Sequence, residues 1–247
     1  MKKVEEAFAK TAKLLFGGEI GQLKRYVKWL ERNVPQGRWL KKGKANVYVP
    51  HYGIFRMMPE GTVVPEEEFA SIGEGRMNLA ENETVRSLGA KFSSFARYTI
   101  FLREGDNMDV VDCTFYKNLV HGYRVLDAFD NKCIACSLWS DFGESIFGCF
   151  RTFYSKLCIN CFHSSKLTCC FEMDSCSDCG YSYFCHNCEN LQDCMFCFNA
   201  KNLRYAIGNL VVGREKFMEM KKRLQEHLLK ELKEKGEIRQ SIYKLSD

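Results

Sequence analysis

Residues 149–211 can be written as seven groups of nine: CFRTFYSKL, CINCFHSSK, LTCCFEMDS, CSDCGYSYF, CHNCENLQD, CMFCFNAKN and LRYAIGNLV. The first and fourth positions are each cysteine in five of these groups, and the seventh position is mostly small or apolar. A short period of this kind is typical of solenoids, in which each coil stacks on the previous one and buries surface that it cannot bury alone. The pattern therefore predicts a mainly β protein, a right-handed parallel β-solenoid with nine-residue repeats and ladders of cysteine.

Cysteine suits the interior of such a coil because a free thiol behaves as a small apolar group and is usually buried. Equivalent positions in neighbouring strands lie about 4.8 Å apart, so side chains of equal size form a continuous column. We expect two groups of nine, about 18 residues, to make one coil. Cys161, Cys179 and Cys197 then line one wall, and Cys170 and Cys188 line the other.

Inward residues three positions apart cannot share one face of a flat strand, because strand side chains alternate with a period of two. Each group of nine is therefore expected to contain a short strand and a corner. Gly180 and three asparagines, Asn160, Asn187 and Asn202, suit such corners because these residue types tolerate bent backbone.

The composition divides the 247 residues into three parts, because all 14 cysteines lie between Cys113 and Cys197. Residues 1–112 are predicted to form a helical and mixed N-terminal region, with helices on either side of Gly17-Gly18. Residues 113–212 form the Cys-rich β-solenoid, and residues 213–247 contain a long helix. An apolar stripe at positions 217, 220, 224, 228 and 232 predicts that this helix packs along or caps the last coil. A coiled-coil oligomerisation helix is the alternative.

Composition also bears on location. The net charge of +5 is mild for 247 residues and does not by itself indicate a nucleic-acid-binding protein. Charged residues near the N-terminus interrupt the apolar run that a secretory signal needs, and no segment approaches the ~20 apolar residues of a membrane span. We expect a cytoplasmic protein with reduced thiols and no membrane contact, or a virion protein if the chain comes from a phage.

Zinc is the alternative use of the cysteines, because CxxC pairs supply thiolates to many zinc sites. If zinc is bound, its expected ligands are Cys176, Cys179, Cys185 and Cys188. The gap between these pairs is only five residues, whereas zinc ribbons separate their pairs by about 15–20. Leucine or alanine replaces cysteine at equivalent positions 167, 203 and 206, which a core tolerates and a ligand set does not. We therefore expect no cofactor.

A catalytic cysteine needs one activated thiolate beside a base. His163 and His186 follow cysteines closely, and His121 is near Cys113 in sequence. A row of equivalent buried thiols does not supply such a nucleophile, so no enzyme activity and no catalytic residue is expected. Disulfides between facing walls of the coil remain an alternative if the protein is part of an oxidised virion.

Basic residues are densest between positions 28 and 44, at Lys28, Arg32, Arg38, Lys41, Lys42 and Lys44. One interpretation is a solvated surface. The other is a contact with nucleic acid or an acidic partner. Trp29, Trp39 and Tyr48 are interspersed with these residues and suit stacking on single strands.

The ladder and its ending resemble a group of Cys-rich solenoid proteins of candidate-phyla bacteria and phages, some labelled CaiB/BaiF family. The resemblance covers about residues 149–230. It rests on the repeated CxxC groups, on Asn202-Leu203-Arg204-Tyr205, Ile207 and Asn209, and on the helix start Arg214-Glu215-Lys216-Phe217. It implies a β-solenoid, and no residue here supports the CoA-transferase chemistry in that label. Members often carry an N-terminal zinc ribbon, from which this chain departs because it has no cysteine before Cys113.

These patterns predict a non-enzymatic structural or interaction scaffold, in its most concrete form a virion or assembly component. Its partner is then another protein or a second copy of the chain. The alternative is a zinc-binding or redox-responsive regulator that contacts nucleic acid through residues 28–44.

Overall fold

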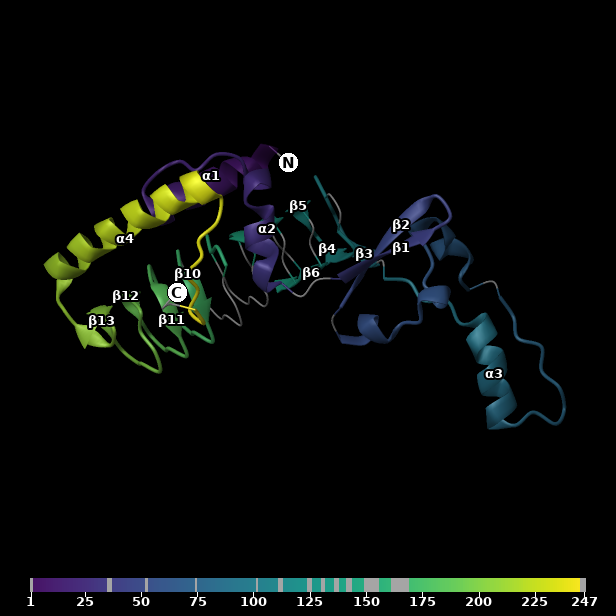
Figure 1. Ribbon diagram of the computed structural model, residues 1–247. Coiled ribbons are helices and arrows are strands. Elements are labelled where there is room, and N and C mark those ends of the chain that lie inside the picture. Colours follow the sequence, from purple (N-terminus) through teal and green to yellow (C-terminus); the bar gives the residue numbers. More distant parts are fainter. Residues whose placement is uncertain are drawn as a thin grey trace. The chain divides into compact units, whose positions relative to one another are not determined.

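The structure, a computed structural model, describes residues 2–34, 37–51, 53–73, 75–100, 102–110, 113–123, 126–129, 132–135, 138–140, 144–148, 156–160 and 169–244. It is a mixed α/β structure with a helix near the N-terminus, small and mostly parallel sheets, and a long helix near the C-terminus (Figure 1). Contacts group the chain into two compact units, residues 1–34 with 103–247 and residues 35–102. The division at residues 112 and 212 stays a prediction.

The N-terminal helix α1 (Lys2–Phe16) buries one apolar face, with Val4, Phe8 and Leu15 at spacings of four and seven. Gly17 follows with a left-handed φ of 74°, which suits the end of a helix because glycine adopts that conformation without strain. The predicted break at the glycine pair is thus confirmed. The second predicted helix consists instead of three short pieces, η1 (Leu23–Arg25), α2 (Val27–Leu30) and η2 (Glu31–Asn33).

Short strands follow. They are β3 (Leu102–Glu104), β4 (Phe115–Lys117), β5 (Val120–Tyr123), β6 (Leu126–Phe129), β7 (Lys132–Ala135), β8 (Leu138–Ser140), β9 (Glu144–Phe147), β10 (Phe171–Asp174), β11 (Tyr183–His186), β12 (Gln192–Met195), β13 (Arg204–Ile207) and β14 (Leu210–Val211). They form sheets of order β3-β4-β6-β8, β5-β7-β9 and β10-β11-β12-β13-β14. Where the register of these sheets is described, the strands are parallel, except for the antiparallel pair β13–β14.

Paired residues in these parallel sheets lie twelve positions apart along the chain, with one shift at β4–β6. Examples are Phe171 with Tyr183, Gln192 with Arg204, and Val120 with Lys132. The isolated bridges between residues 108 and 201, such as Glu189 with Lys201, keep the same offset. The nine-residue group is therefore not the spacing at which strands pair, and the expected coil of about 18 residues is wrong.

Within residues 169–206, every third side chain points into a common core. The buried members are Cys170, Met173, Cys176, Cys179, Ser182, Cys185, Cys188, Leu191, Cys194, Cys197, Ala200 and Ala206. The residue before each of them has a positive φ near 50°, as at Phe184 and Asn187. This left-handed bend interrupts the period-two alternation of a strand and returns every third side chain to the interior. The predicted bends at Asn160, Asn187 and Asn202 are confirmed, whereas Gly180 does not have a positive φ.

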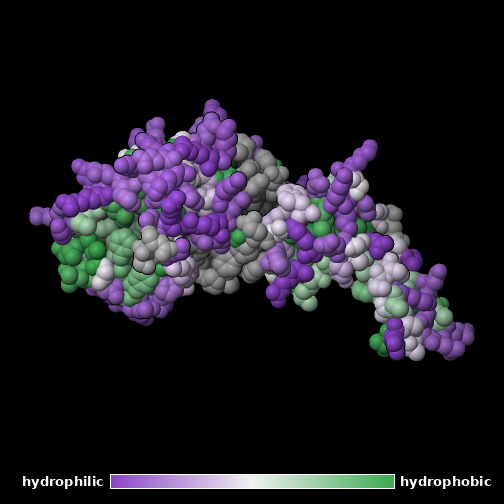
Figure 2. Space-filling view, viewed as in Figure 1, coloured by the Kyte–Doolittle hydropathy of each residue, from purple (hydrophilic) through white to green (hydrophobic). Residues whose placement is uncertain are grey.

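The helix α4 (Arg214–Lys235) begins after Gly213 and ends at Gly236, whose φ is 76°, as the sequence predicts. It contacts α1, β12 and β13, and its outer face is hydrophilic (Figures 1 and 2). Phe8, Phe217 and Tyr183 belong to the core between helices and strands. The helix therefore packs along the strands, while the edge of β13 is paired with β14 rather than covered by the helix. No described helix is long and apolar enough to cross a membrane.

The second unit, described by itself, contains the antiparallel hairpin β1 (Gly37–Lys42) and β2 (Ala45–Pro50). The hairpin is followed by η3 (Gly53–Met57), η4 (Glu60–Thr62), η5 (Glu66–Ser71) and α3 (Val85–Phe95). A small apolar core contains Leu40, Val47, Val49, Val63 and Ile100. This core lies against one face of the hairpin, because its hairpin members occupy the same strand face.

Candidate functional site

The cysteine side chains that the structure describes are all buried and free of disulfides. They are Cys113, Cys158, Cys169, Cys170, Cys176, Cys179, Cys185, Cys188, Cys194 and Cys197. Cys136, Cys149, Cys161 and the side chain of Cys133 lie outside the described residues, as does His163. The predicted wall of Cys161, Cys179 and Cys197 is wrong for its described members, because residues stack at an offset of twelve. The pairs Tyr183–Met195 and His186–Phe198 place Cys197 next to Cys185 instead.

Inward thiols donate hydrogen bonds to backbone carbonyl oxygens. Three thiols donate to a carbonyl oxygen nine residues later in the chain. These bonds are Cys176 Sγ to Cys185 O at 3.5 Å, Cys188 Sγ to Cys197 O at 3.3 Å, and Cys194 Sγ to Leu203 O at 3.4 Å. The same three thiols also approach the carbonyl two residues earlier in the chain. A thiol is a weak donor, and these contacts satisfy it inside the core.

The thiols also contact one another. Hydrogen bonds to Cys179 and Cys188, followed by burial, raise the pKa of Cys176. The bond from Cys176 lowers the pKa of Cys188 to about 7. A hydrogen bond to Cys197, with burial, raises the pKa of Cys185. The predicted zinc ligands Cys176, Cys179, Cys185 and Cys188 are all buried thiols of this core. In the part of the chain that is described, no three or more His, Cys, Asp and Glu side chains are grouped so that they could hold a metal ion.

His186 and the preceding Cys185 point to different environments. His186 Nδ1 lies 3.0 Å from Asp174 Oδ2, whereas the Cys185 thiol donates to Tyr183 O at 3.4 Å. Among the described residues Nδ1 makes no hydrogen bond, so the contact with Asp174 is an ion pair only when the imidazole is protonated. His121 likewise faces a carboxylate, with Nδ1 3.0 Å from Asp109 Oδ2. The Cys185 thiol thus donates to a backbone carbonyl, while the imidazole of His186 faces a carboxylate.

A buried carboxyl group that the sequence patterns missed lies under the C-terminal segment. Glu172 has no exposed surface and accepts a hydrogen bond from Ile242 N at 3.4 Å. Burial raises the pKa of Glu172 to about 7. The hydroxyl of Tyr243 donates to Asp174 Oδ2 at 2.5 Å, beside this contact. No periodic signal marks Glu172, because the C-terminal segment that covers it, including Ile242, lies about seventy positions later in the chain.

The ammonium group of Lys221, on α4, contacts side chains of the neighbouring strand region. Its Nζ lies 5.5 Å from the centre of the Tyr181 ring, 5.7 Å from that of Tyr183 and 5.9 Å from that of Phe217. The carboxylate oxygen Oδ1 of Asp193 is 3.6 Å away. A cation over aromatic faces is attracted by the ring quadrupoles, more so when it is shielded from water. The sequence stripe, defined by apolar residues alone, did not predict this contact.

A second part of the strand surface is polar and exposed. Asn190 Nδ2 donates to Asn202 Oδ1 at 2.7 Å, and Lys201 Nζ lies 2.6 Å from Glu189 Oε2. All four residues are exposed, and each pair joins positions twelve residues apart. The strands therefore present rows of aligned polar side chains to solvent.

The residues of the predicted basic cluster lie in two different compact units. Lys28 and Arg32 belong to the first unit, where Arg32 Nη1 donates to Ile238 O at 3.2 Å. The other four residues, Arg38, Lys41, Lys42 and Lys44, belong to the hairpin of the second unit. Trp29 is only 3% exposed, so its ring is not available to stack on a base.

Comparison with known proteins adds no relative to this description. The resemblance to Cys-rich solenoid proteins of bacteria and phages stays a prediction. No protein-family model, curated protein or solved structure matches the chain.

Proposed function

We propose that the chain is a non-enzymatic interaction scaffold built on a right-handed β-solenoid with twelve-residue coils. The offset of twelve between paired residues recurs from Met108–Val120 to Gln192–Arg204, with one shift at β4–β6, and supports a repeated coil. Parallel crossover connections are right-handed in nearly all proteins, which supports the hand. Each coil would then bury one layer of inward side chains and present the rest to solvent.

The observation on which this proposal depends is that the inward thiols are buried and hydrogen-bonded. Inward thiols such as Cys188 and Cys194 hydrogen-bond to backbone carbonyls and have little or no exposed surface. They act as core material, so the surface available to a partner is the outward rows. The aligned row that includes Glu189, Asn190, Lys201 and Asn202 is exposed, and it suits a protein partner that offers complementary polar groups.

Counting reactive thiols tests the structural half of this proposal. The protein would be titrated with a thiol reagent before and after denaturation, and zinc would be measured per chain. We expect the ten cysteines described as buried to react only after denaturation. Stoichiometric zinc that is lost together with the protection would overturn the role of the thiols as core material and favour the zinc-binding alternative.

Site-specific crosslinking tests the interaction half. A photoreactive amino acid would replace Lys201 on the polar row or, as a matched control, Lys230 on the exposed side of α4; both side chains are well exposed. In cells that express the full chain, we expect one dominant adduct from position 201 and none of that mass from position 230. The same adducts from both positions, or none from position 201, would overturn the assignment of this row as the binding side.

A further inference from the structure

The β1–β2 hairpin of the second unit has two different faces. Leu40, Val47 and Val49 are buried on one face. Side chains alternate along a strand, so Trp39 and Lys41 lie on the opposite face. Tyr48 is directly opposite Trp39 in the register, with 5.1 Å between the ring centres. Trp39 is 58% exposed, which is unusual for so large an apolar ring.

The same alternation separates the basic residues of the hairpin. Arg38, on the inner side, forms an ion pair with Glu60 at 3.1 Å and also donates to Met58 O at 3.1 Å. Lys42 donates to the backbone oxygen of Glu60. These two cations are therefore engaged within the unit and contribute little to an outward surface.

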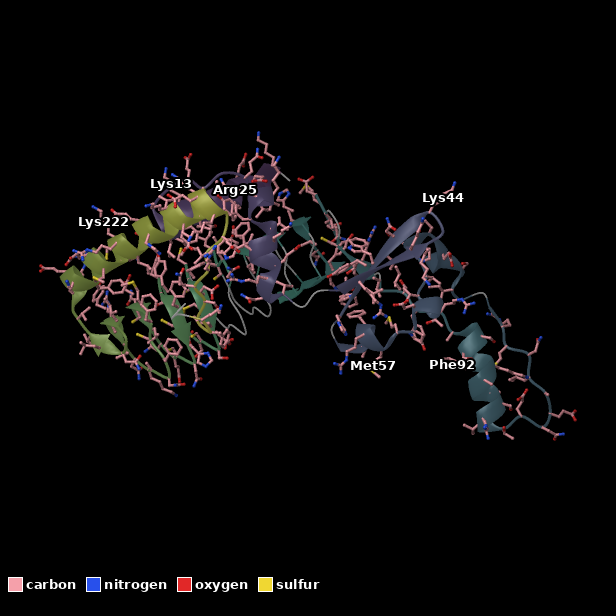
Figure 3. All side chains as sticks on the ribbon, viewed as in Figure 1. Lys13, Arg25, Lys44, Met57, Phe92 and Lys222 are labelled. Carbon is pink, nitrogen blue, oxygen red and sulfur yellow. The ribbon has the colours of Figure 1, made fainter. Side chains whose placement is uncertain are left out.

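Lys41 and Lys44 are exposed, and neither forms an ion pair with a described residue. Lys44 lies in the turn between the strands, at the tip of the hairpin, and its side chain extends away from the unit (Figure 3). The segment from Gly37 to Pro50 contains four basic residues and no acidic one. The outer face, taken together with Lys44 at the adjoining tip, thus combines an exposed indole ring with two cations and lacks a carboxylate of its own.

We propose that this outer face, formed by Trp39, Lys41, Lys44 and Tyr48, binds single-stranded nucleic acid. A base would stack on the exposed face of Trp39, and the two ammonium groups would contact neighbouring phosphates. An acidic peptide would use the lysines but would not need the indole ring. A duplex keeps its bases stacked inside, so it would also leave the ring unused. The combination of ring and cations is therefore what selects single strands.

Fluorescence anisotropy of a labelled 20-nucleotide oligo(dT) with the full chain tests this proposal. We expect saturable binding, and Trp39→Ala should weaken it about tenfold or more, as for loss of one stacked base. Trp39→Phe keeps a ring and should retain most of the affinity. The affinity should fall with salt with a log–log slope of about −1.4, because each single-strand phosphate contact contributes about −0.7.

Charge reversal supplies the matched control. Lys41→Glu should reduce binding strongly, whereas Arg86→Glu, an exposed change of equal charge on α3 of the same unit, should have little effect. Circular dichroism melting would show that each variant is folded. The proposal is overturned if oligo(dT) does not bind, if Trp39→Ala binds as tightly as the wild type, or if both reversals weaken binding equally. Equal competition by poly-glutamate would also overturn it, since it would indicate a general anion surface.

Discussion

The thiol of Cys188 donates a hydrogen bond to the carbonyl oxygen of Cys197, nine residues later, over 3.3 Å. The same nine-residue step joins Cys170 to Cys179, Cys176 to Cys185 and Cys194 to Leu203. Paired residues lie twelve positions apart, and inward residues lie three apart. A step of nine therefore leads to the neighbouring strand, to the inward residue just before the one that pairs directly. The nine-residue spacing therefore describes a thiol-to-carbonyl contact between layers.

This arrangement predicts that a small residue can replace an inward cysteine. Cys194→Ala should lower the free energy of unfolding by about 1 kcal/mol, the effect of removing one small buried group. The chain already has alanine twelve positions later, at Ala206, which is fully buried. Cys194→Glu should lower it by about 3–5 kcal/mol, because it buries an unpaired charge. Urea unfolding monitored by circular dichroism would measure both. If the alanine variant were as unstable as the glutamate variant, the thiol would have a role beyond packing.

The sequence predicts which residues point into the core better than it predicts the offset at which the strands pair. Inward positions repeat every three residues, and any multiple of three matches that pattern. Cysteines at Cys176, Cys185 and Cys194 favour nine, whereas the strands pair at an offset of twelve. Left-handed residues such as Asn187 and Asn199 bend the backbone before each inward position. Asparagine gives some signal of these bends, but Phe184 and Phe196 adopt the same conformation without any. Sequence propensity could not predict a left-handed phenylalanine, since stacking between the two rings, 5.2 Å apart, accompanies it.

The C-terminal helix and the basic cluster also differ in how far the sequence predicts them. The long C-terminal helix follows from its apolar stripe and flanking glycines, and its bounds agree with the structure. The basic cluster at residues 28–44 is contiguous in sequence, yet Arg32 contacts Ile238 and Arg38 contacts Glu60 in separate units. Contacts between residues far apart in the chain decide which cations are available, and local sequence does not contain that information.

A left-handed position should distinguish glycine from a β-branched residue. Asn190 has a φ of 54°, and its amide donates to Asn202. Both Asn190→Gly and Asn190→Val remove the amide, but only valine adds the steric penalty of about 1–2 kcal/mol for a left-handed backbone. The valine variant should therefore be less stable than the glycine variant by about that amount in urea unfolding. Equal stability of the two variants would contradict the assigned backbone conformation.

Removing the charge of Lys221 should loosen α4. Lys221→Met keeps most of the side-chain volume but loses the attraction to three rings and to Asp193. We therefore expect the free energy of unfolding to fall by about 1–2 kcal/mol. The adjacent Lys222 is exposed on the outer side of the helix (Figure 3). Lys222→Met should change stability by less than about 0.5 kcal/mol. Hydrogen exchange of α4 amides would show faster opening in the first variant and not in the second. Indistinguishable exchange would contradict the contribution of this cation.

Glu172 should make the stability depend on pH. Its pKa is raised by burial from 4.5 to about 7, so between these values the folded chain binds more protons than the unfolded chain. Stability from this group is therefore complete below about pH 4.5 and is lost as pH rises to about 7, a difference of about 3 kcal/mol. Glu172→Gln keeps the shape without titrating. The wild type should lose more stability than the glutamine variant between pH 5 and pH 8 in urea unfolding.

Since Glu172 accepts from Ile242 N, hydrogen exchange of residues 238–243 should quicken over the same range only in the wild type. Parallel pH profiles for the two proteins would show that the carboxyl group titrates normally and that burial under the C-terminal segment is incomplete.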